Sequence, residues 1–153
     1  MTPSTEVHPA ALDADALADE CDVTQLRRSG PGGQRRNKVE TGLRLLHRPS
    51  GVNVEATERR NLAENRRVGM RRLRLALALE VRRPVAEGYE PSAAWRQHCQ
   101  NRRIAVSEEH EHFPALVAEV LDLIVANQGD LRPVAERLDC TASQLVKLLK
   151  AAP

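Results

Sequence analysis

Two stretches near the start of the chain alternate between apolar and polar residues. Residues 52–56 alternate strictly, and residues 40–47 do so in part. An alternation with a period of two is typical of a half-buried β-strand. A proline–serine–glycine turn at residues 49–51 separates the two stretches, so together they predict a β-hairpin. A weaker alternation predicts one more strand over residues 23–28.

A long amphipathic helix is predicted after the hairpin. Asn61 and Glu64 have the spacing of a capping box, which marks the start of a helix. Pro84 limits the helix at its other end, because proline disrupts a helix interior. Between these points the apolar residues recur along one face, which consists of Leu62, Met70, Leu73, Leu77 and Val81. A shorter acidic helix is predicted over residues 10–20.

The last part of the chain has a helical pattern. Three helices are predicted over residues 115–125, 134–138 and 143–149, and Thr141 with Gln144 forms a second capping box. We therefore predict an α+β fold, with a small mixed or antiparallel sheet and a long packed helix, followed by a small all-α helical module. The predicted organisation is a flexible N-terminus over residues 1–9, a first domain over 10–83, a linker over 84–91 and the helical module over 92–153.

The basic residues gather in the middle of the chain. Residues 27–83 contain sixteen Lys and Arg against five acids, whereas residues 1–26 contain six acids and no Lys or Arg. Such a dense basic stretch points to a polyanion partner such as RNA, although a solvated basic surface would give the same pattern. Aromatic residues make up 2% of the chain. RNA binding would therefore rest on charge and backbone contacts rather than on base stacking.

Size and cysteine content restrict the class of protein. A chain of 153 residues fits one domain with a small appended module and excludes a large multidomain enzyme. Cys21, Cys99 and Cys140 are odd in number and widely spaced, which points to a reducing compartment. No apolar stretch is long enough to cross a bilayer, and the N-terminus lacks the pattern of a signal peptide. We expect a cytoplasmic protein that does not contact a membrane.

Residues 29–34 contain three glycines and a proline, which no helix or strand interior would tolerate, and end in Gln34. A conventional hydrolase uses titratable side chains or a metal, but this loop offers glycine backbone and one neutral amide. Any catalysis by this loop must therefore come from the positions in which it holds its backbone N–H groups and this amide. Glycines let backbone N–H groups approach a ligand closely and stabilise charge on an oxygen. The amide of Gln34 can donate and accept hydrogen bonds, so it suits the orientation of a water.

The order of motifs around this loop resembles the catalytic domain of class I peptide chain release factors. The resemblance runs without a break over residues 22–80. Its motifs are Ser29-Gly-x-Gly-Gly-Gln-x-x-Asn37-Lys38, His47-x-Pro49-x-Gly51 and Glu58-Arg59 followed by Asn65-Arg66.

The resemblance implies that the substrate is the ester between the nascent peptide and the P-site tRNA, with water as the nucleophile. The implied catalytic residues are Gly32, Gly33 and Gln34. The backbone N–H of Gln34 would stabilise the transition state, its side chain would help to admit water, and the two glycines would allow the backbone shape. Gln34 is also the implied target of N-methylation by a glutamine methyltransferase. No cofactor is expected.

The implied partners are the rRNA of the large ribosomal subunit and the P-site peptidyl-tRNA, and the protein is expected to be a monomer. Basic and polar residues beside the loop and on the long helix would contact phosphates. The predicted RNA-binding residues are Arg27, Arg28, Arg35, Arg36, Asn37, Lys38, Arg59, Arg66, Arg67, Arg71 and Arg72.

The chain differs from full-length release factors, because 153 residues leave no room for a codon-reading domain. It also differs from small rescue relatives, which end in a strongly basic tail, whereas residues 84–153 are net acidic. We therefore expect codon-independent, ribosome-dependent hydrolysis of peptidyl-tRNA, in translation release or in the rescue of stalled ribosomes. How a stalled ribosome would be recognised stays open.

An alternative from a different class also stays open. Residues 134–149 resemble a helix-turn-helix, whose second helix offers Gln144, Lys147 and Lys150 to a nucleic acid. The protein would then be a non-catalytic ribosome- or RNA-binding regulator.

No metal site is predicted. His47, His98, His110 and His112 lack a companion Cys or carboxylate at a convincing ligand spacing. The acidic residues around His110 are expected to mark an exposed loop.

Overall fold

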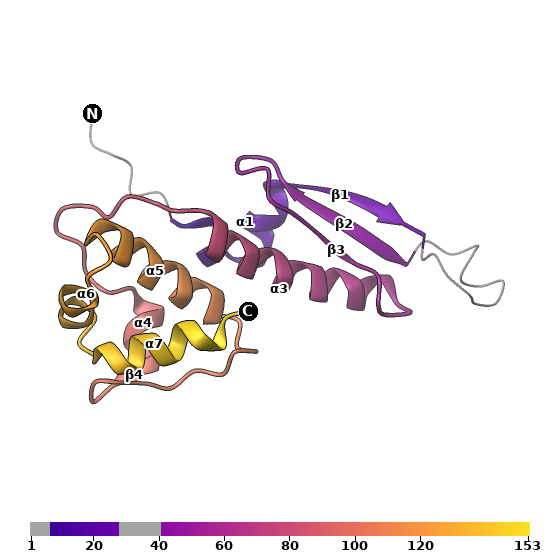
Figure 1. Ribbon diagram of the computed structural model, residues 1–153. Helices are drawn as coiled ribbons and strands as arrows, with labels where there is room; N and C mark the ends of the chain where they lie inside the picture. Colours follow the sequence, from indigo (N-terminus) through magenta and orange to yellow (C-terminus); the bar gives the residue numbers. More distant parts are fainter. Residues whose placement is uncertain (1–6, 28–40) are drawn as a thin grey trace. The chain divides into compact units, whose positions relative to one another are not determined.

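The computed structural model describes residues 7–27 and 41–153 (Figure 1). Its contacts divide the chain into two compact units, the first formed by Leu12–Leu77 and the second by Ala78–Pro153 together with the N-terminal segment that ends at Ala11. The predicted limits of the functional domains at residues 83 and 91 stay a prediction. Each unit is described by itself.

The first unit contains a small antiparallel sheet. Its strands are β1 (Cys21–Leu26), β2 (Gly42–His47) and β3 (Asn53–Ala56), in the order β1-β2-β3. Within the hairpin formed by β2 and β3, Leu43 pairs with Ala56 and Leu46 pairs with Asn53. The predicted hairpin and its turn are therefore confirmed. Strand β1 begins two residues earlier than residue 23, where the sequence pattern placed it.

Helix α3 (Leu62–Glu80) follows the sheet, and its residues up to Leu77 belong to the first unit. The side-chain amide oxygen of Asn61 accepts hydrogen bonds from the backbone N–H groups of Ala63 and Glu64, so the predicted cap is confirmed. The helix ends at Glu80, four residues before Pro84, whose ring would clash with the carbonyl of residue 80 in a continued helix and which has no N–H to donate.

The face of α3 that packs on the sheet differs in part from the predicted one. Its buried residues within the unit are Asn65, Gly69, Leu73 and Leu77, which recur every four residues. Three residues of the predicted face, Leu62, Met70 and Val81, are only half-buried. The hydrophobic pattern did not predict this face fully, because two of its four buried positions are the polar Asn65 and the small Gly69.

Gly69 allows α3 to approach the sheet closely. A Cβ atom at this position would lie 3.0 Å from Leu43 Cδ1 and 3.2 Å from Leu45 Cδ1. Both leucines are buried, so a larger residue would overpack this contact. The core of the unit is thus built from aliphatic side chains around one glycine.

A short helix precedes the sheet, as predicted. Helix α1 (Ala14–Asp19) is capped by Asp13, whose carboxylate accepts a hydrogen bond from the N–H of Ala16. Leu17 is buried on its inner side, and the three aspartates of the segment are exposed.

The second unit is helical. It contains the 3-10 helix η1 (Pro9–Ala11), α4 (Ala93–His98), the short strands β4 (Cys99–Gln100) and β5 (Arg103–Ile104), α5 (Phe113–Ala126), α6 (Leu131–Arg137) and α7 (Ala142–Ala151). The last three helices and the capping hydrogen bond from Gln144 N–H to Thr141 Oγ1 confirm the predicted pattern. The sequence pattern did not predict α4 or the antiparallel pair formed by β4 and β5.

Large apolar side chains form the core of the second unit. Trp95 of α4 and Phe113 of α5 are buried. The indole N–H of Trp95 donates a hydrogen bond of 2.8 Å to the carbonyl oxygen of Leu138, so its polar atom is satisfied inside the core. This bond joins α4 to the end of α6.

The segment between α3 and α4 lacks regular secondary structure and packs on α5. Arg82 forms an ion pair of 2.9 Å with Asp122, and the backbone N–H of Arg83 donates to the same carboxylate. The hydroxyl of Tyr89 donates to Glu119. Among the helices in the described part of the chain, none is long and apolar enough to cross a membrane.

The N-terminal segment packs on α5 through η1. Pro9 is buried. The ring of His8 donates to the carbonyl oxygen of Val81 at 2.9 Å and accepts from the N–H of Ala10 at 3.0 Å. A flexible terminus was expected through residue 9, whereas residues 8 and 9 are held by these contacts.

Candidate functional site: the base of a glycine-rich loop

The candidate loop leaves and re-enters the sheet at one place. Leu26, the last residue of β1, pairs with Gly42, the first residue of β2. Residues 28–40, which connect them, lie outside the described residues. These include the predicted catalytic residues Gly32, Gly33 and Gln34 and the predicted RNA-binding residues Arg28, Arg35, Arg36, Asn37 and Lys38. The roles of these residues therefore stay predictions, whereas the base of the loop can be built from its contacts.

Asn65 holds the C-terminal side of this base. Its side chain is fully buried on α3. Its Nδ2 donates to the carbonyl oxygen of Thr41 at 2.6 Å and to that of Arg59 at 3.0 Å, while its Oδ1 accepts from the N–H of Arg59 at 2.9 Å. The amide thus uses both donor hydrogens and one acceptor site on backbone groups of two segments. It ties the residue before β2 to the turn that precedes α3.

Gly42 fixes the same point by its lack of a side chain. A Cβ atom there would lie 2.8 Å from Thr57 Cγ2 and 3.2 Å from the carbonyl oxygen of Leu26. The strand end can lie this close to β1 and to Thr57 only because glycine has no Cβ. The sequence motifs assign no role to Gly42 or to Asn65. A glycine at a strand end and a polar residue on an apolar helix face were the signals that could have found them.

His47 has a structural role at the other end of β2. Its ring is 1% exposed. Nε2 lies 2.7 Å from a carboxylate oxygen of Glu20, and Nδ1 lies 2.6 Å from Oγ of Ser50. Because a carboxylate accepts, Nε2 donates to Glu20, while Nδ1 shares a hydrogen bond with the hydroxyl of Ser50. The histidine of the motif therefore links α1, β2 and the following turn.

The described members of the predicted RNA-binding set are exposed. They are Arg27, Arg59, Arg66, Arg67, Arg71 and Arg72. Four of them lie on α3, and Arg59 lies in the turn held by Asn65. The structure therefore presents these cations on the surface of the unit that carries the loop.

Arg72 has a partner within the unit. Its Nη1 lies 2.7 Å from Glu58 Oε1 and donates to the carbonyl oxygen of Glu55 at 2.8 Å. The hydrogen bond from Arg72 lowers the pKa of the Glu58 carboxyl. Both side chains are exposed, and an exposed pair of this kind contributes about 0–1 kcal/mol. A phosphate could replace the carboxylate at little cost.

The helix-turn-helix residues of the second unit are only partly available. Lys147 and Lys150 are exposed on α7. The side-chain oxygen of Gln144 instead accepts a hydrogen bond of 3.1 Å from the N–H of Ile104 in β5. Gln144, one of the three polar side chains expected to contact a nucleic acid, thus connects α7 to β5.

The second unit brings three histidines together. His98, His110 and His112 each offer a ring nitrogen, and these nitrogens lie within 4.8 Å of one another. The sequence predicts no metal site here, because no Cys or carboxylate accompanies these histidines at ligand spacing. A ligand set made of histidine alone requires neither. The only signal in the sequence is the His110-x-His112 pair, because His98 lies on another element.

Comparison with known proteins places the chain in a family. Residues 12–113 match the model of the RF-1 domain, a range that covers most of the first unit and part of the second. The chain therefore belongs to the RF-1 domain family, as the motifs predicted.

Several curated relatives are called peptide chain release factor 1. The chain is 37% identical over 89 residues to the protein of Acidiphilium cryptum (strain JF-5). This alignment covers 57% of this chain and 25% of the relative. It is 31% identical over 160 residues to that of Parafrankia sp. (strain EAN1pec), covering 96% of this chain and 43% of the relative. For the protein of Chlorobaculum tepidum (strain ATCC 49652 / DSM 12025 / NBRC 103806 / TLS) the identity is 30% over 148 residues, with shares of 88% and 40%. The chain thus spans less than half the length of each of these relatives.

Proposed function

We propose that this chain hydrolyses the ester of peptidyl-tRNA on the ribosome. The observation that carries the proposal is the match to the RF-1 domain over residues 12–113, which encloses Gly32-Gly33-Gln34 between two paired strand ends. The names of the relatives support a role in translation termination. A cytoplasmic location is part of the same proposal.

The chemistry would rest on backbone geometry. Gly32 and Gly33 would let the chain adopt a shape that presents the N–H of Gln34 to the oxygen that gains charge in the transition state. The side chain of Gln34 would orient the attacking water. The ester and the water lie in the ribosome, so the protein needs no titratable group of its own at the tip. Methylation of Gln34 by a glutamine methyltransferase would modify this same side chain.

The base of the loop would act as a support for this placement. Asn65 and Gly42 hold the residues next to the loop in one position relative to α3 and β1. A loop whose two ends are fixed loses less conformational entropy when its catalytic residues are positioned at the substrate. The exposed arginines of α3 would contact phosphates of rRNA or tRNA and so orient the unit.

We further propose that these 153 residues act without reading a codon. The match to the RF-1 domain and the second, helical unit account for most of the chain. The second unit would then serve recruitment to a stalled or vacant ribosome rather than codon recognition.

A peptide-release assay tests both proposals. Ribosomes that carry labelled peptidyl-tRNA in the P site would be prepared with a stop codon, a sense codon or no codon in the A site. We expect wild type to release peptide in all three cases, and Gln34→Ala to release it more slowly. Gln25→Ala is the matched control, because Gln25 is an exposed residue of β1 outside the loop.

The outcomes separate the hypotheses. Release only at a stop codon would reject codon independence and keep the hydrolase. Binding to ribosomes without any release would reject the hydrolase and favour the alternative, a ribosome- or RNA-binding regulator. Equal slowing by Gln25→Ala and Gln34→Ala would show that the effect does not belong to the loop.

A further inference from the structure

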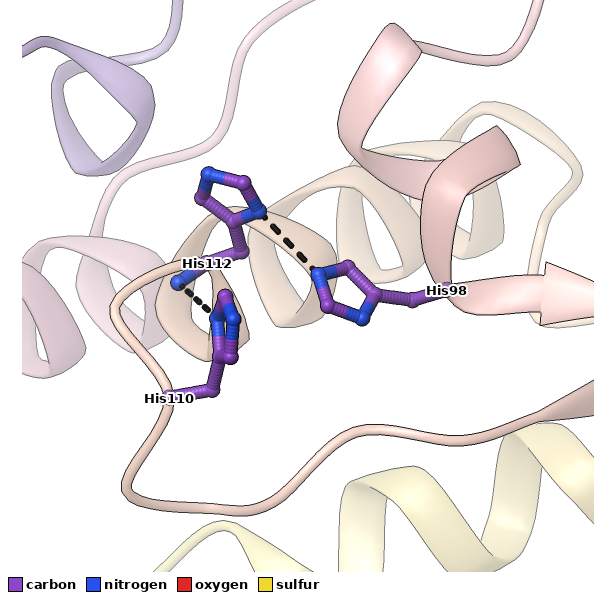
Figure 2. A group of neighbouring side chains, drawn as sticks. All are labelled: His98, His110 and His112. Atoms are coloured by element: carbon purple, nitrogen blue, oxygen red, sulfur yellow. Dashed lines mark hydrogen bonds between the residues drawn. The ribbon is translucent and has the colours of Figure 1, made fainter.

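The three histidines of the second unit lie at the meeting point of two elements. His98 is the last residue of α4, and His110 and His112 lie in the turn that leads into α5. Figure 2 shows the three rings turned toward one another from these two segments. Their ring centroids are 4.6, 4.9 and 5.3 Å apart. All three side chains are half-buried, so an ion could reach them.

The hydrogen bonds of His98 determine which of its nitrogens can bind an ion. Nδ1 lies 3.3 Å from the carbonyl oxygen of Ala105. A carbonyl only accepts, so Nδ1 donates to it, and Nε2 is the ring nitrogen left to bind an ion. A histidine ligand whose other nitrogen donates to a backbone carbonyl is a common arrangement in metal sites. Nε2 shares a hydrogen bond of 3.1 Å with Nδ1 of His112, and an ion bound between the two rings would replace this bond.

His112 is arranged in the complementary way. Its Nδ1 faces His98, and its Nε2 lies 3.9 Å from a carboxylate oxygen of Glu111. This distance is too long for a hydrogen bond, so the carboxylate acts on the ring only through its charge. Two nitrogens bound to one tetrahedral zinc at about 2.0–2.1 Å are separated by about 3.3 Å. The observed separation of 3.1 Å between the facing nitrogens of His98 and His112 is close to this value.

His110 supplies the third ring. Its Nδ1 accepts a hydrogen bond of 3.0 Å from the backbone N–H of His112, which holds the ring beside the other two (Figure 2). On metal binding this hydrogen bond has to break and the ring has to turn, so that the 4.8 Å spread of the three ligand atoms is reduced to that of a bound ion. The turn before α5 is not part of a helix or strand, so this movement does not break regular structure.

We propose that His98, His110 and His112 bind one divalent transition-metal ion, with Zn²⁺ as the preferred ion. Three imidazoles suit zinc, copper or nickel, whereas Mg²⁺ and Ca²⁺ prefer oxygen ligands. The fourth position would be filled by water, with the exposed carboxylate of Glu111 close by. This site is independent of the glycine-rich loop and of the proposed hydrolysis.

The ion would act on the structure of the helical unit. It would join the end of α4 to the start of α5 and close the segment between them, which contains β4 and β5. Closing that segment in the folded state links metal binding to stability. Ile104 of strand β5 also donates a backbone hydrogen bond to the side-chain oxygen of Gln144 of α7. The bound ion would therefore stabilise the arrangement of α4, α5 and α7.

Metal titration of the full chain, freed of metal with a chelator, tests the proposal. We expect calorimetry to give one Zn²⁺ per chain and Co²⁺ to give the visible absorption of a four-coordinate site. The thermal midpoint should rise with Zn²⁺ and stay unchanged with Mg²⁺. His110→Gln and the double variant His110→Gln/His112→Gln should weaken Zn²⁺ binding at least tenfold and remove the rise in the thermal midpoint.

Cys99→Ser is the matched control, because Cys99 follows His98 in sequence and is a free, half-buried thiol. It should bind Zn²⁺ as wild type does. His110→Gln lies outside any helix, so it reports on binding even if a change at His98 prevents folding, and circular dichroism confirms that each variant is folded. The proposal is overturned if wild type binds no Zn²⁺, if the histidine variants bind it equally well, or if Cys99→Ser abolishes binding.

Discussion

The side-chain amide of Asn65 donates a hydrogen bond of 2.6 Å to the carbonyl oxygen of Thr41. This bond joins the first turns of α3 to the residue at which the chain returns from the glycine-rich segment to β2. An asparagine on the buried face of a helix would be costly without partners. Here its partners are backbone groups of Thr41 and Arg59, so one residue stabilises both the helix packing and the base of the loop.

Replacement of Asn65 by Ala should destabilise the first unit and slow peptide release. The change leaves the carbonyl oxygens of Thr41 and Arg59 and the N–H of Arg59 without the amide. A buried polar group that loses its partner costs about 1–3 kcal/mol, so we expect a loss of about 2–4 kcal/mol in the free energy of unfolding. Urea unfolding measures this loss. Asn53→Ala, at an exposed position of β3, is the control, and an equal effect there would argue against the anchor.

The exposed arginines of α3 should determine how ribosome binding depends on salt. Each phosphate contact releases counterions, so binding should weaken steeply as salt concentration rises. The triple variant Arg66→Gln/Arg67→Gln/Arg71→Gln should bind more weakly at low salt and show a shallower slope of log affinity against log salt. Arg132→Gln on α6, also exposed, is the matched control. Equal slopes for the triple variant and wild type would remove these residues from the RNA-binding set.

Tyr89 should ionise only when the second unit unfolds. Burial raises the pKa of its hydroxyl above the ordinary value of 10.0, and the nearby Glu119 carboxylate raises it further. The folded state therefore holds the proton more tightly than the unfolded state. The stability that this supplies is complete below pH 10 and is lost as the pH rises above it.

The ultraviolet absorbance of tyrosinate measures this directly, because the chain has one tyrosine. We expect ionisation to coincide with the loss of helical circular dichroism above pH 10. Tyr89→Phe should be less sensitive to alkaline pH than wild type. Ionisation of a fully folded chain near pH 10 would contradict the burial of this hydroxyl.

His8 should make the second unit less stable in mild acid. Burial lowers the pKa of its ring below the ordinary value of 6.5, although its bond to Val81 and the charge of Asp122 act in the opposite direction. The unfolded state therefore binds the proton first, and stability present above pH 6.5 is lost as the pH falls below it. The range from pH 7 to pH 5 lies around this value. Over this range the thermal midpoint of His8→Gln should fall less steeply with pH than that of wild type. Parallel curves for the two proteins would contradict this role of His8.

Much of the fold could be predicted from the pattern of apolar residues, because the hairpin and the long helices repeat that pattern several times. Helix α4 and strands β4 and β5 are too short to show a period. Their positions depend on tertiary contacts, such as the bond from Trp95 to Leu138. The buried face of α3 was identified only in part, since its packing uses an asparagine and a glycine where the pattern has apolar residues.

The sequence motifs predicted the candidate site, whereas the residues that hold the loop in place were identified only in the structure. The glycine-rich loop has a distinctive sequence, and the match to the RF-1 domain confirms the family. The roles of Gly32, Gly33 and Gln34 stay predictions. Gly42 and Asn65 could not be assigned from sequence because their function is contact with segments far along the chain. The histidine cluster was missed for the same reason, as His98 comes from a different element than His110 and His112.

In the proposed mechanism, the backbone N–H of Gln34, presented by two glycines, stabilises the transition state of ester hydrolysis. The rate of peptide release at saturating protein, compared between Gln34→Ala and Gln34→Pro, tests it most directly. Both variants lack the side-chain amide, but only proline also lacks the backbone N–H. We expect Gln34→Ala to retain measurable release and Gln34→Pro to lose it, with equal binding to the ribosome. Equal release by the two variants would contradict the claim.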